Sequence, residues 1–266
     1  MPKYLKSMKQ DSISIVDDSM QKALEELWEK YKNEFSAEMS DQAKNLGEIL
    51  DRGRVWAEND SEKTEILVTE INPSARQKDS EFENKSFRYH EVQHDPYYAE
   101  IKKKLLGDDL NGKAGYLDLF AVRETVQKRM SRFIKHPIGL SFVAEHLAIT
   151  QKEIERLRPR LIIVKNKGSW MFWGLDAGQT AGKWTNVWMG YTFDQISGYE
   201  DVAGRPWKVR RITGLLDTPD RVGKEIRETC LVGTIVLFTS HLQYLKKEDR
   251  PTIEMVMQLY DSVSSN

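Results

Sequence analysis

The chain has little cysteine, no long apolar run and almost no net charge, and each of these absences excludes a class of protein or of site. Its 266 residues include one cysteine, Cys230, which excludes an internal disulfide framework and a Cys-ligated iron–sulfur cluster. No run approaches the ~20 apolar residues that span a bilayer. The basic start MPKYLKSMKQ leads into polar residues rather than an apolar signal core. We therefore expect a cytoplasmic protein with no membrane contact.

Several familiar motifs are also missing. The sequence contains no G-x-G-x-x-G, no G-x-x-x-x-G-K-[ST] and no G-x-S-x-G. It shows no His, Cys and Asp spacing that resembles a zinc site. Because the net charge is −1, no overall basic character indicates a nucleic-acid partner. The sequence thus predicts neither metal nor cofactor, and any basic surface must be local.

What the chain does contain is a series of four apolar strands separated by helical patterns. The third strand has a continuous apolar centre, typical of a parallel sheet covered on both faces. The pattern predicts an α/β fold, a three-layer α/β/α sandwich around a mainly parallel four-stranded sheet. The strands are expected at 64–71, 112–120, 160–166 and 233–240.

Two helices at the start of the chain suggest a separate extension. Residues 14–37 carry apolar side chains at three-to-four spacing and an acidic polar face. A second helix is expected at 41–51. We interpret residues 1–55 as an N-terminal helical extension packed on a core domain, 56–266, with a β-hairpin insertion at about 184–216. Further helices are expected at 95–106, 121–136, 140–157, 217–228 and from Asp249 to about 263.

Polar residues follow each predicted strand. The first strand ends in Glu70-Ile71-Asn72-Pro73-Ser74, where the proline biases Asn72 toward an extended or turn conformation. Ligands of open α/β sheets bind at the carboxyl ends of the strands. We therefore expect Asn72, Asp118 and His241 to line one cleft. The corresponding polar residues of the second, third and fourth strands are Asp118, Asn166, and Ser240 with His241.

These motifs, in this order, resemble the uracil-DNA glycosylase superfamily, in its mismatch-specific and single-strand-selective branches. EINPS is similar to the family's first motif, (G/E)-x-N-P-(G/S) after a strand. The turn His241-Leu242-Gln243-Tyr244-Leu245 stands where the family typically has H-P-S-P-L. The resemblance covers roughly residues 60–265, with YLDLF and RPRLIIVKN as intervening strands. Two departures are Glu70 in place of the usual glycine and Leu-Gln-Tyr in place of Pro-Ser-Pro.

The resemblance implies a glycosylase-like fold that hydrolyses the N-glycosidic bond of uracil or another damaged base in single-stranded or mismatched DNA, without a cofactor. Asn72 would position the hydrolytic water, and His241 would donate to the departing base. Leu245 would fill the stack after the base leaves. The substrate-binding residues implied, some by position alone, are Ser74, Asp118, Phe82, Phe87 and Asn166. The DNA-binding candidates are Arg76, Lys78, Ser240, Gln243, Leu245 and Lys246.

Each feature also has a purely structural interpretation. Asn-Pro turns are common after strands, His241 could cap a helix, and Asp118 could cap the helix expected near Ala121. The basic face of 121–136 could simply be solvated. Two other functions therefore stay open. One is a catalytically inactive relative that binds nucleic acid or a nucleotide. The other is an interaction protein that uses its acidic N-terminal helix. The oligomeric state stays open too.

Overall fold

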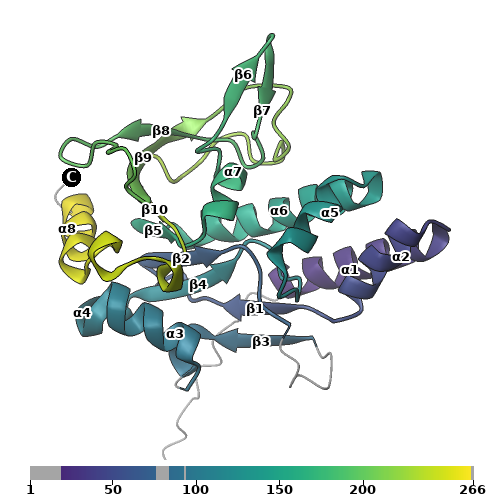
Figure 1. Ribbon diagram of the computed structural model, residues 1–266, viewed down its shortest axis with the longest axis horizontal. Helices are drawn as coiled ribbons and strands as arrows, with labels where there is room; N and C mark the ends of the chain where they lie inside the picture. The colour runs from purple at the N-terminus through teal and green to yellow at the C-terminus, as the bar shows by residue number, and fades with distance from the viewer. Residues whose placement is uncertain (1–18, 76–83, 93, 265–266) are drawn as a thin grey trace, which may run out of the picture.

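A mixed six-stranded sheet forms the centre of the computed structural model, which describes residues 19–75, 84–92 and 94–264 (Figure 1). The strand order is β4-β2-β5-β10-β9-β8. The first four strands are mutually parallel, and β9 and β8 continue the sheet antiparallel. Their bounds are β4 (Ala114–Asp118), β2 (Ile66–Glu70), β5 (Leu161–Val164), β10 (Ile235–Thr239), β9 (Trp207–Leu215) and β8 (Tyr191–Gln195).

The α/β class and the four parallel strands agree with the sequence prediction, but the predicted four-stranded sheet is wrong. The segment interpreted as an inserted hairpin supplies β8 and β9. Main-chain pairing between β9 and β10 joins this segment to the sheet, with Leu237 opposite Val209. A strand edge left unpaired at β10 would expose a row of backbone donors and acceptors. The antiparallel pair covers that edge and gives a mixed sheet.

Alternate residues of the parallel strands enter two different cores. In β2, Leu67 belongs to one core, and Ile66 and Val68 belong to the other. Every residue of the four parallel strands is buried. The sheet is therefore covered on both faces, which explains the continuous apolar runs of the sequence.

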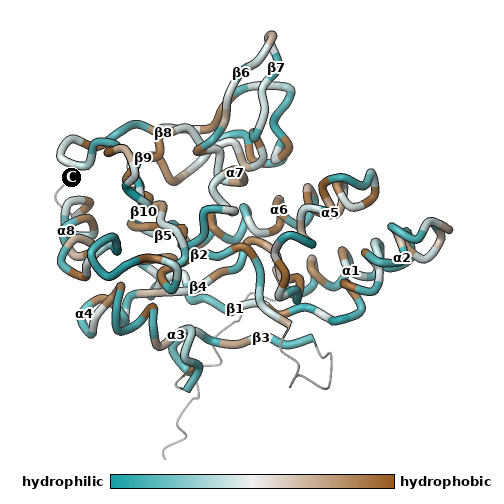
Figure 2. The backbone as a smooth tube through the Cα atoms, viewed as in Figure 1, coloured by the Kyte–Doolittle hydropathy of each residue, from teal (hydrophilic) through white to brown (hydrophobic). Residues whose placement is uncertain are grey.

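The first core is covered by α1 (Ser19–Ala37), α2 (Asp41–Leu50), α5 (Met130–Ile134), α6 (Pro137–Leu157) and α7 (Trp170–Trp173). The second core is covered by α3 (Pro96–Ile101), the π-helical turn Lys102–Leu106, α4 (Gly107–Asn111) and α8 (Ile253–Ser264). Hydrophobic and hydrophilic stretches alternate along α1 in Figure 2, as expected of a helix with one buried face.

Local sequence signals determine the start of α3 and the end of α6. Asp95 caps α3 by accepting from the Tyr97 amide at 2.9 Å, and Pro96 occupies the first turn. α6 ends where Arg158 adopts a left-handed conformation with φ 48°. Arg158 precedes Pro159, and a residue before proline is disfavoured in the right-handed helical region. These ends agree with the sequence prediction to within a few residues.

The remaining strands form two small sheets. β1 (Val55–Glu58) pairs in parallel with β3 (Lys85–Arg88), and β6 (Gly178–Thr180) forms a hairpin with β7 (Lys183–Thr185). Short 3₁₀ turns occur at Tyr89–Glu91, Gln127–Arg129, Lys167–Ser169, Leu242–Tyr244 and Lys247–Asp249. In the part of the chain described, every helix is too short or too polar to cross a membrane.

Two predicted helices are wrong because tertiary hydrogen bonds take their backbone groups. In the predicted helix 121–136, only Gln127–Arg129 and α5 are helical. The Glu124 amide instead donates to the Pro73 oxygen at 3.0 Å, beside the exit of β2. Residues 217–228 form an irregular loop, in which the amide of Val222 donates to Val187 at 3.1 Å.

Candidate active site at the carboxyl ends of the parallel strands

A pocket of about 1010 Å³ lies where the four parallel strands end. Its lining includes Asn72 after β2, Asp118 at the end of β4, Asn166 after β5 and His241 after β10. These are the polar residues that the sequence places at the strand ends. The parallel sheet thus brings together side chains that are far apart in the chain.

Most of the other predicted site residues line the same pocket. They are Ser74, Phe87, Ser240, Gln243 and Leu245. Phe87 lies on β3 and packs against Tyr98, with ring centroids 5.4 Å apart, so it belongs to an aromatic wall. Lys246 is exposed and does not line the pocket. Arg76, Lys78 and Phe82 lie outside the described residues.

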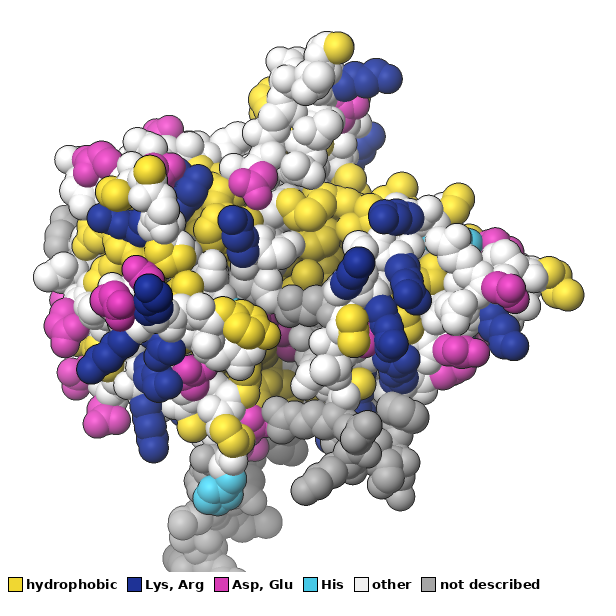
Figure 3. All heavy atoms as spheres, viewed as in Figure 1, with side chains coloured by type: hydrophobic (Ala, Val, Ile, Leu, Met, Phe, Trp, Pro, Cys, Tyr) yellow, Lys and Arg dark blue, Asp and Glu magenta, His cyan; other side chains and the backbone are white. Residues whose placement is uncertain are grey.

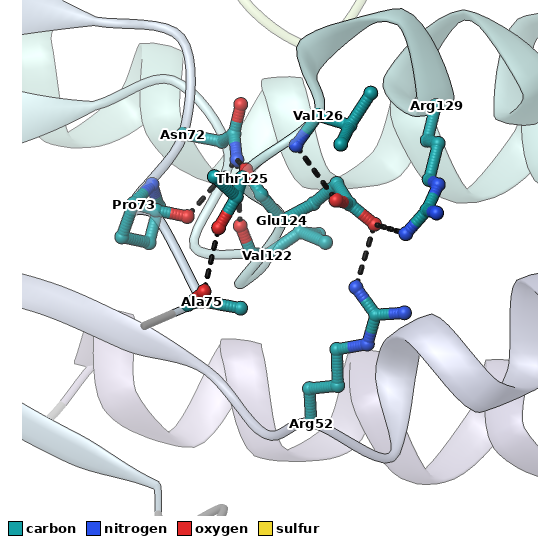
Figure 4. Close-up of polar contacts among 9 residues, drawn as sticks. All are labelled: Arg52, Asn72, Pro73, Ala75, Val122, Glu124, Thr125, Val126 and Arg129. Atoms are coloured by element: carbon teal, nitrogen blue, oxygen red, sulfur yellow. Dashed lines mark hydrogen bonds and ion pairs between the residues drawn. The ribbon is translucent and has the colours of Figure 1, made fainter. Parts of the chain in front are cut away.

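Asn72 has a structural task in addition to its place in the pocket. Its amide nitrogen donates to the main-chain oxygens of Pro73, Val122 and Glu124 at 3.0, 3.1 and 2.7 Å (Figure 4). Three carbonyl neighbours require the donor end of the amide on this side. The other end, Oδ1, is buried and has no hydrogen-bond partner among the described residues. Asn72 therefore fixes the adjoining segment and keeps one acceptor unused.

The segment that Asn72 holds is itself fixed by a buried carboxylate. Glu124 accepts from Arg52 at 2.6 Å and from the amide of Val126 at 2.7 Å. Arg129 lies 3.5 Å from the same carboxylate (Figure 4). The Thr125 hydroxyl donates to the main-chain oxygen of Ala75 at 2.6 Å. Charge-assisted bonds of this kind are stronger than neutral ones, so this side of the pocket is rigidly supported.

Two carboxyl groups lie side by side at the base of the pocket. Glu70 and Asp118 are register partners at the ends of β2 and β4, and both are buried. Glu70 Oε1 accepts from Lys165 Nζ at 2.8 Å. Lys165 has no exposed side-chain surface, and its Nζ lies 4.1 Å from the ring centre of Tyr97. The positive charge of the Lys165 ammonium group therefore balances the negative charge of the buried Glu70 carboxylate.

Asp118 has the opposite electrostatic environment. Burial, followed by the negative charge of Glu70, raises the pKa of Asp118 well above its ordinary value. The Tyr116 hydroxyl donates to Asp118 Oδ1 at 3.0 Å. Asp118 therefore keeps its proton to a higher pH than an ordinary aspartic acid. The helix-cap interpretation of Asp118 is wrong, because residues 119–126 are not helical.

His241, after the end of β10, faces the Glu70 carboxylate at the same edge of the sheet. Its Nε2 lies 4.0 Å from Glu70 Oε1, and its ring packs against Tyr97 and Tyr244. Burial lowers the pKa of His241, although the charge of Glu70 opposes the shift. The imidazole is therefore neutral near pH 7. It makes no capping hydrogen bond to the Leu242–Tyr244 turn, so the capping interpretation is not observed.

The rim of the pocket combines an aromatic side chain with basic residues. Tyr244 is 79% exposed and lines the pocket beside Leu245. Lys85 and Lys167 are exposed lining residues. Lys and Arg side chains also gather over α5 and the turn before it (Figure 3), where the exposed residues are Lys128, Arg132 and Lys135. The rim therefore presents an exposed aromatic ring and positive charge to a molecule in the pocket.

Glu70, Lys165 and Tyr97 are among the polar groups of the site that the sequence does not identify as functional. In the sequence, Glu70 is recognisable only as a departure from the glycosylase motif. A lysine at the end of an otherwise apolar strand was the available signal for Lys165, because buried lysines almost always have a partner.

A second pocket of about 600 Å³ includes Thr64 and Gly115, near the amino ends of β2 and β4. Its charged side chains are largely engaged with one another. Arg156 donates to Glu153 at 2.7 Å, and Arg88 lies 3.4 Å from Glu58. The pocket at the carboxyl ends of the strands is therefore the better candidate for catalysis.

No protein-family model, curated protein or solved structure matches this chain. The described residues contain no group of three or more His, Cys, Asp or Glu side chains that could hold a metal ion.

Proposed function

We propose that this protein hydrolyses N-glycosidic bonds and releases uracil or another altered base from DNA. The observation that carries the proposal is the arrangement of Asn72, Asp118 and His241 around one pocket. Asn72 offers an acceptor oxygen without a hydrogen-bond partner among the described residues, Asp118 a carboxyl group whose pKa is raised, and His241 an imidazole whose pKa is lowered. This bond cleavage builds negative charge on the base and positive charge on the sugar. Such a reaction needs donors at the base and acceptors near the attacking water.

The proposed roles follow from those polar groups. His241 and Asp118 donate hydrogen bonds to the departing base, where they stabilise its developing charge. Asn72 positions the water that attacks the sugar. Its fixed orientation avoids the cost of ordering an amide during the reaction, because three main-chain oxygens already hold the nitrogen.

The shape of the site favours a base without a paired partner. A base must leave the stack to enter such a pocket, which costs a few kcal/mol in a duplex and least in a single strand. Tyr244 at the rim can stack on a neighbouring base. Leu245, on the pocket wall, can fill the space that the base vacates. We therefore propose single-stranded or mismatched DNA as the substrate.

The direct test is an excision assay with uracil and hypoxanthine, each in single-stranded DNA and in mismatched duplex. His241→Ala and Asp118→Asn should each slow base release by about 10²-fold, which is typical when one oriented donor is lost. His90→Ala is the matched control, since His90 is exposed and lies in the second pocket. Failure of the wild type to release any of these bases would rule out the proposal.

Two observations favour a second candidate, binding without catalysis. The amide nitrogen of Asn72 is committed to the main chain, and a turn with an exposed Gln243 and Tyr244 replaces the short Pro-Ser-Pro turn. A protein of this kind would bind single-stranded DNA and release no base. Measuring binding and release on the same oligonucleotides separates the two functions.

A further inference from the structure

Glu70 is a buried carboxylate that reaches the pocket, and only part of its acceptor capacity is used. Oε1 is bound to Lys165 at 2.8 Å. Oε2 has a long contact of 3.5 Å with the amide nitrogen of Asn166. Glu70 also lines the pocket, so Oε2 can accept from a molecule bound there. The Tyr97 hydroxyl also donates to the Glu70 carboxylate. An ionised carboxylate has about four lone-pair positions, and these contacts occupy three.

We propose that Glu70 is a further catalytic residue, which takes a proton from the attacking water, and that Lys165 is its positioning residue. This inference rests on the proposed function, because the attacking water belongs to that reaction. It adds a base to Asn72, Asp118 and His241, none of which takes a proton from water in the proposed function. Lys165, the residue after β5, holds Glu70 in place, with the ring of Tyr97 packed over its ammonium.

Charged groups on every neighbouring element support the assignment. Glu70 faces Lys165 directly after β5, Asp118 on β4 and His241 after β10. Tyr97 packs from α3, and the charge of Glu100 on the same helix also acts on His241. Burial, followed by the negative charge of Glu70, raises the pKa of its neighbour Asp118. A carboxyl group with a raised pKa beside a second carboxylate is the usual arrangement of an acid and a base.

The reaction balances with these two groups. The bond between the sugar carbon and the base nitrogen breaks, and its electron pair leaves with the base. The water oxygen bonds to the sugar carbon, and the water proton passes to Glu70. Asp118 gives its proton to the base. Transfer of a proton from Glu70 to Asp118, directly or through solvent, restores both groups. One water is consumed, and a sugar hydroxyl and a neutral base are formed.

The decisive variant is Glu70→Gln, which keeps the shape and leaves a carbonyl oxygen for Lys165 to bind. We expect it to fold, to bind single-stranded DNA as the wild type does, and to excise 10²-fold to 10³-fold more slowly, roughly the range for loss of a general base. Glu65→Gln is the control, because Glu65 forms an ion pair with Arg160 outside the pocket. If Glu70→Gln excises as fast as the wild type, the inference is wrong while the proposed function stands.

An NMR titration of Asp118 and His241 tests the inference without an activity assay. Removal of the Glu70 charge should lower the pKa of the Asp118 carboxyl and of the His241 imidazole, as followed by NMR in wild type and Glu70→Gln. Unchanged pKa values would overturn the inference whatever the assay shows. If the wild type excises nothing, the proposed function fails, and lowered pKa values would still support Glu70 and Asp118 as a coupled acid and base.

Lys165→Met tests the positioning role. Without the neighbouring ammonium, the Glu70 carboxylate is harder to keep ionised, so the acid limb of the excision–pH profile should move to higher pH. A merely structural lysine would lower stability without moving that limb. If Lys165→Met fails to fold, the double variant with Glu70→Gln removes the unpaired buried charge. Recovery of folding in the double variant supports the pairing, and continued failure to fold contradicts it.

Discussion

The amide nitrogen of Asn72 and the main-chain oxygen of Glu124 lie 2.7 Å apart, and this hydrogen bond joins the exit of β2 to the segment after β4. The same nitrogen also contacts the oxygens of Pro73 and Val122. Asn72 therefore stabilises the fold whether or not it takes part in a reaction. Loss of activity in an Asn72 variant would not by itself identify a catalytic role.

Substitution of Asn72 should reveal that structural task. Asn72→Ala removes a donor shared by three carbonyl groups, which should cost about 1–3 kcal/mol in unfolding free energy. Asn72→Asp should cost more at neutral pH, because a carboxylate would face the same three oxygens. The difference between the two variants should shrink in acid, where the aspartic acid regains a hydrogen. Urea denaturation at neutral and acidic pH measures both effects. An Asp variant as stable as wild type would contradict this account.

His146 should make the protein sensitive to acid. It is fully buried, its Nε2 accepts from the Ala121 amide at 2.9 Å, and burial lowers its pKa to about 3. The unfolded chain, with an ordinary histidine pKa near 6.5, then binds protons more readily than the folded chain. The stability contributed by neutral His146 is therefore complete above about pH 6.5 and is lost as pH falls toward 3.

His146→Gln removes this titration while keeping an acceptor for the Ala121 amide. Between about pH 7 and pH 4, the wild type should lose roughly 3 kcal/mol more unfolding free energy than the variant. Denaturation at a series of pH values gives this difference directly, and titration of all other groups cancels in the comparison. Parallel curves for the two proteins would contradict the prediction.

Gly139 allows a close approach between α6 and the end of α5. A Cβ atom placed there would lie 2.4 Å from the Phe133 oxygen and 2.8 Å from the Phe133 Cα. Because backbone cannot yield as a flexible side chain can, Gly139→Ala should destabilise by about 1–3 kcal/mol. Gly112→Ala is the control, since nothing lies within 4 Å of the added atom. Thermal unfolding of both variants tests the contrast, and equal melting temperatures would refute it.

Tyr244 should contribute to DNA binding without contributing to stability. It is 79% exposed at the pocket rim. Stacking of a base on an aromatic ring is worth about 1–3 kcal/mol, so Tyr244→Ala should weaken binding to single-stranded DNA by at least about fivefold. Val232→Ala, at another exposed apolar residue, is the control. Affinity should also fall steeply with added salt if Lys85 and Lys167 contact phosphates. Binding that is insensitive to salt would exclude that contact.

The sequence predicts the parts of this fold that have strong local signals. The four parallel strands are continuous apolar runs, and α1 buries a regular stripe that includes Leu24, Trp28 and Tyr31. Strands β1 and β3 have four residues each, and they pair with one another although β2 lies between them in the sequence. No local sequence pattern therefore predicts them. The helix predicted at 121–136 is wrong in its first residues, because these residues form hydrogen bonds to the segment after β2, which is distant in the sequence.

The candidate site also contains residues that the sequence predicts and residues that it does not. Asn72, Asp118, Asn166 and His241 are recognisable because each follows or ends a strand, and parallel strands end together. Lys165 and Glu70 are not recognisable as a pair, because 95 residues separate them in the chain. The partner of a buried charge depends on which strands become neighbours in the sheet, and the local sequence does not determine the strand order.

The turn after β10 contains one residue that packs in the core and two residues that face the pocket rim. Leu242 is completely buried in the second core, whereas Gln243 and Tyr244 point outward. Substitutions at 243 and 244 can therefore change what the pocket rim accepts at little cost to stability. A proline at 242 would instead remove a core side chain. Directed evolution of new substrate preference should accordingly concentrate its changes at the two exposed residues, while Leu242 stays constant.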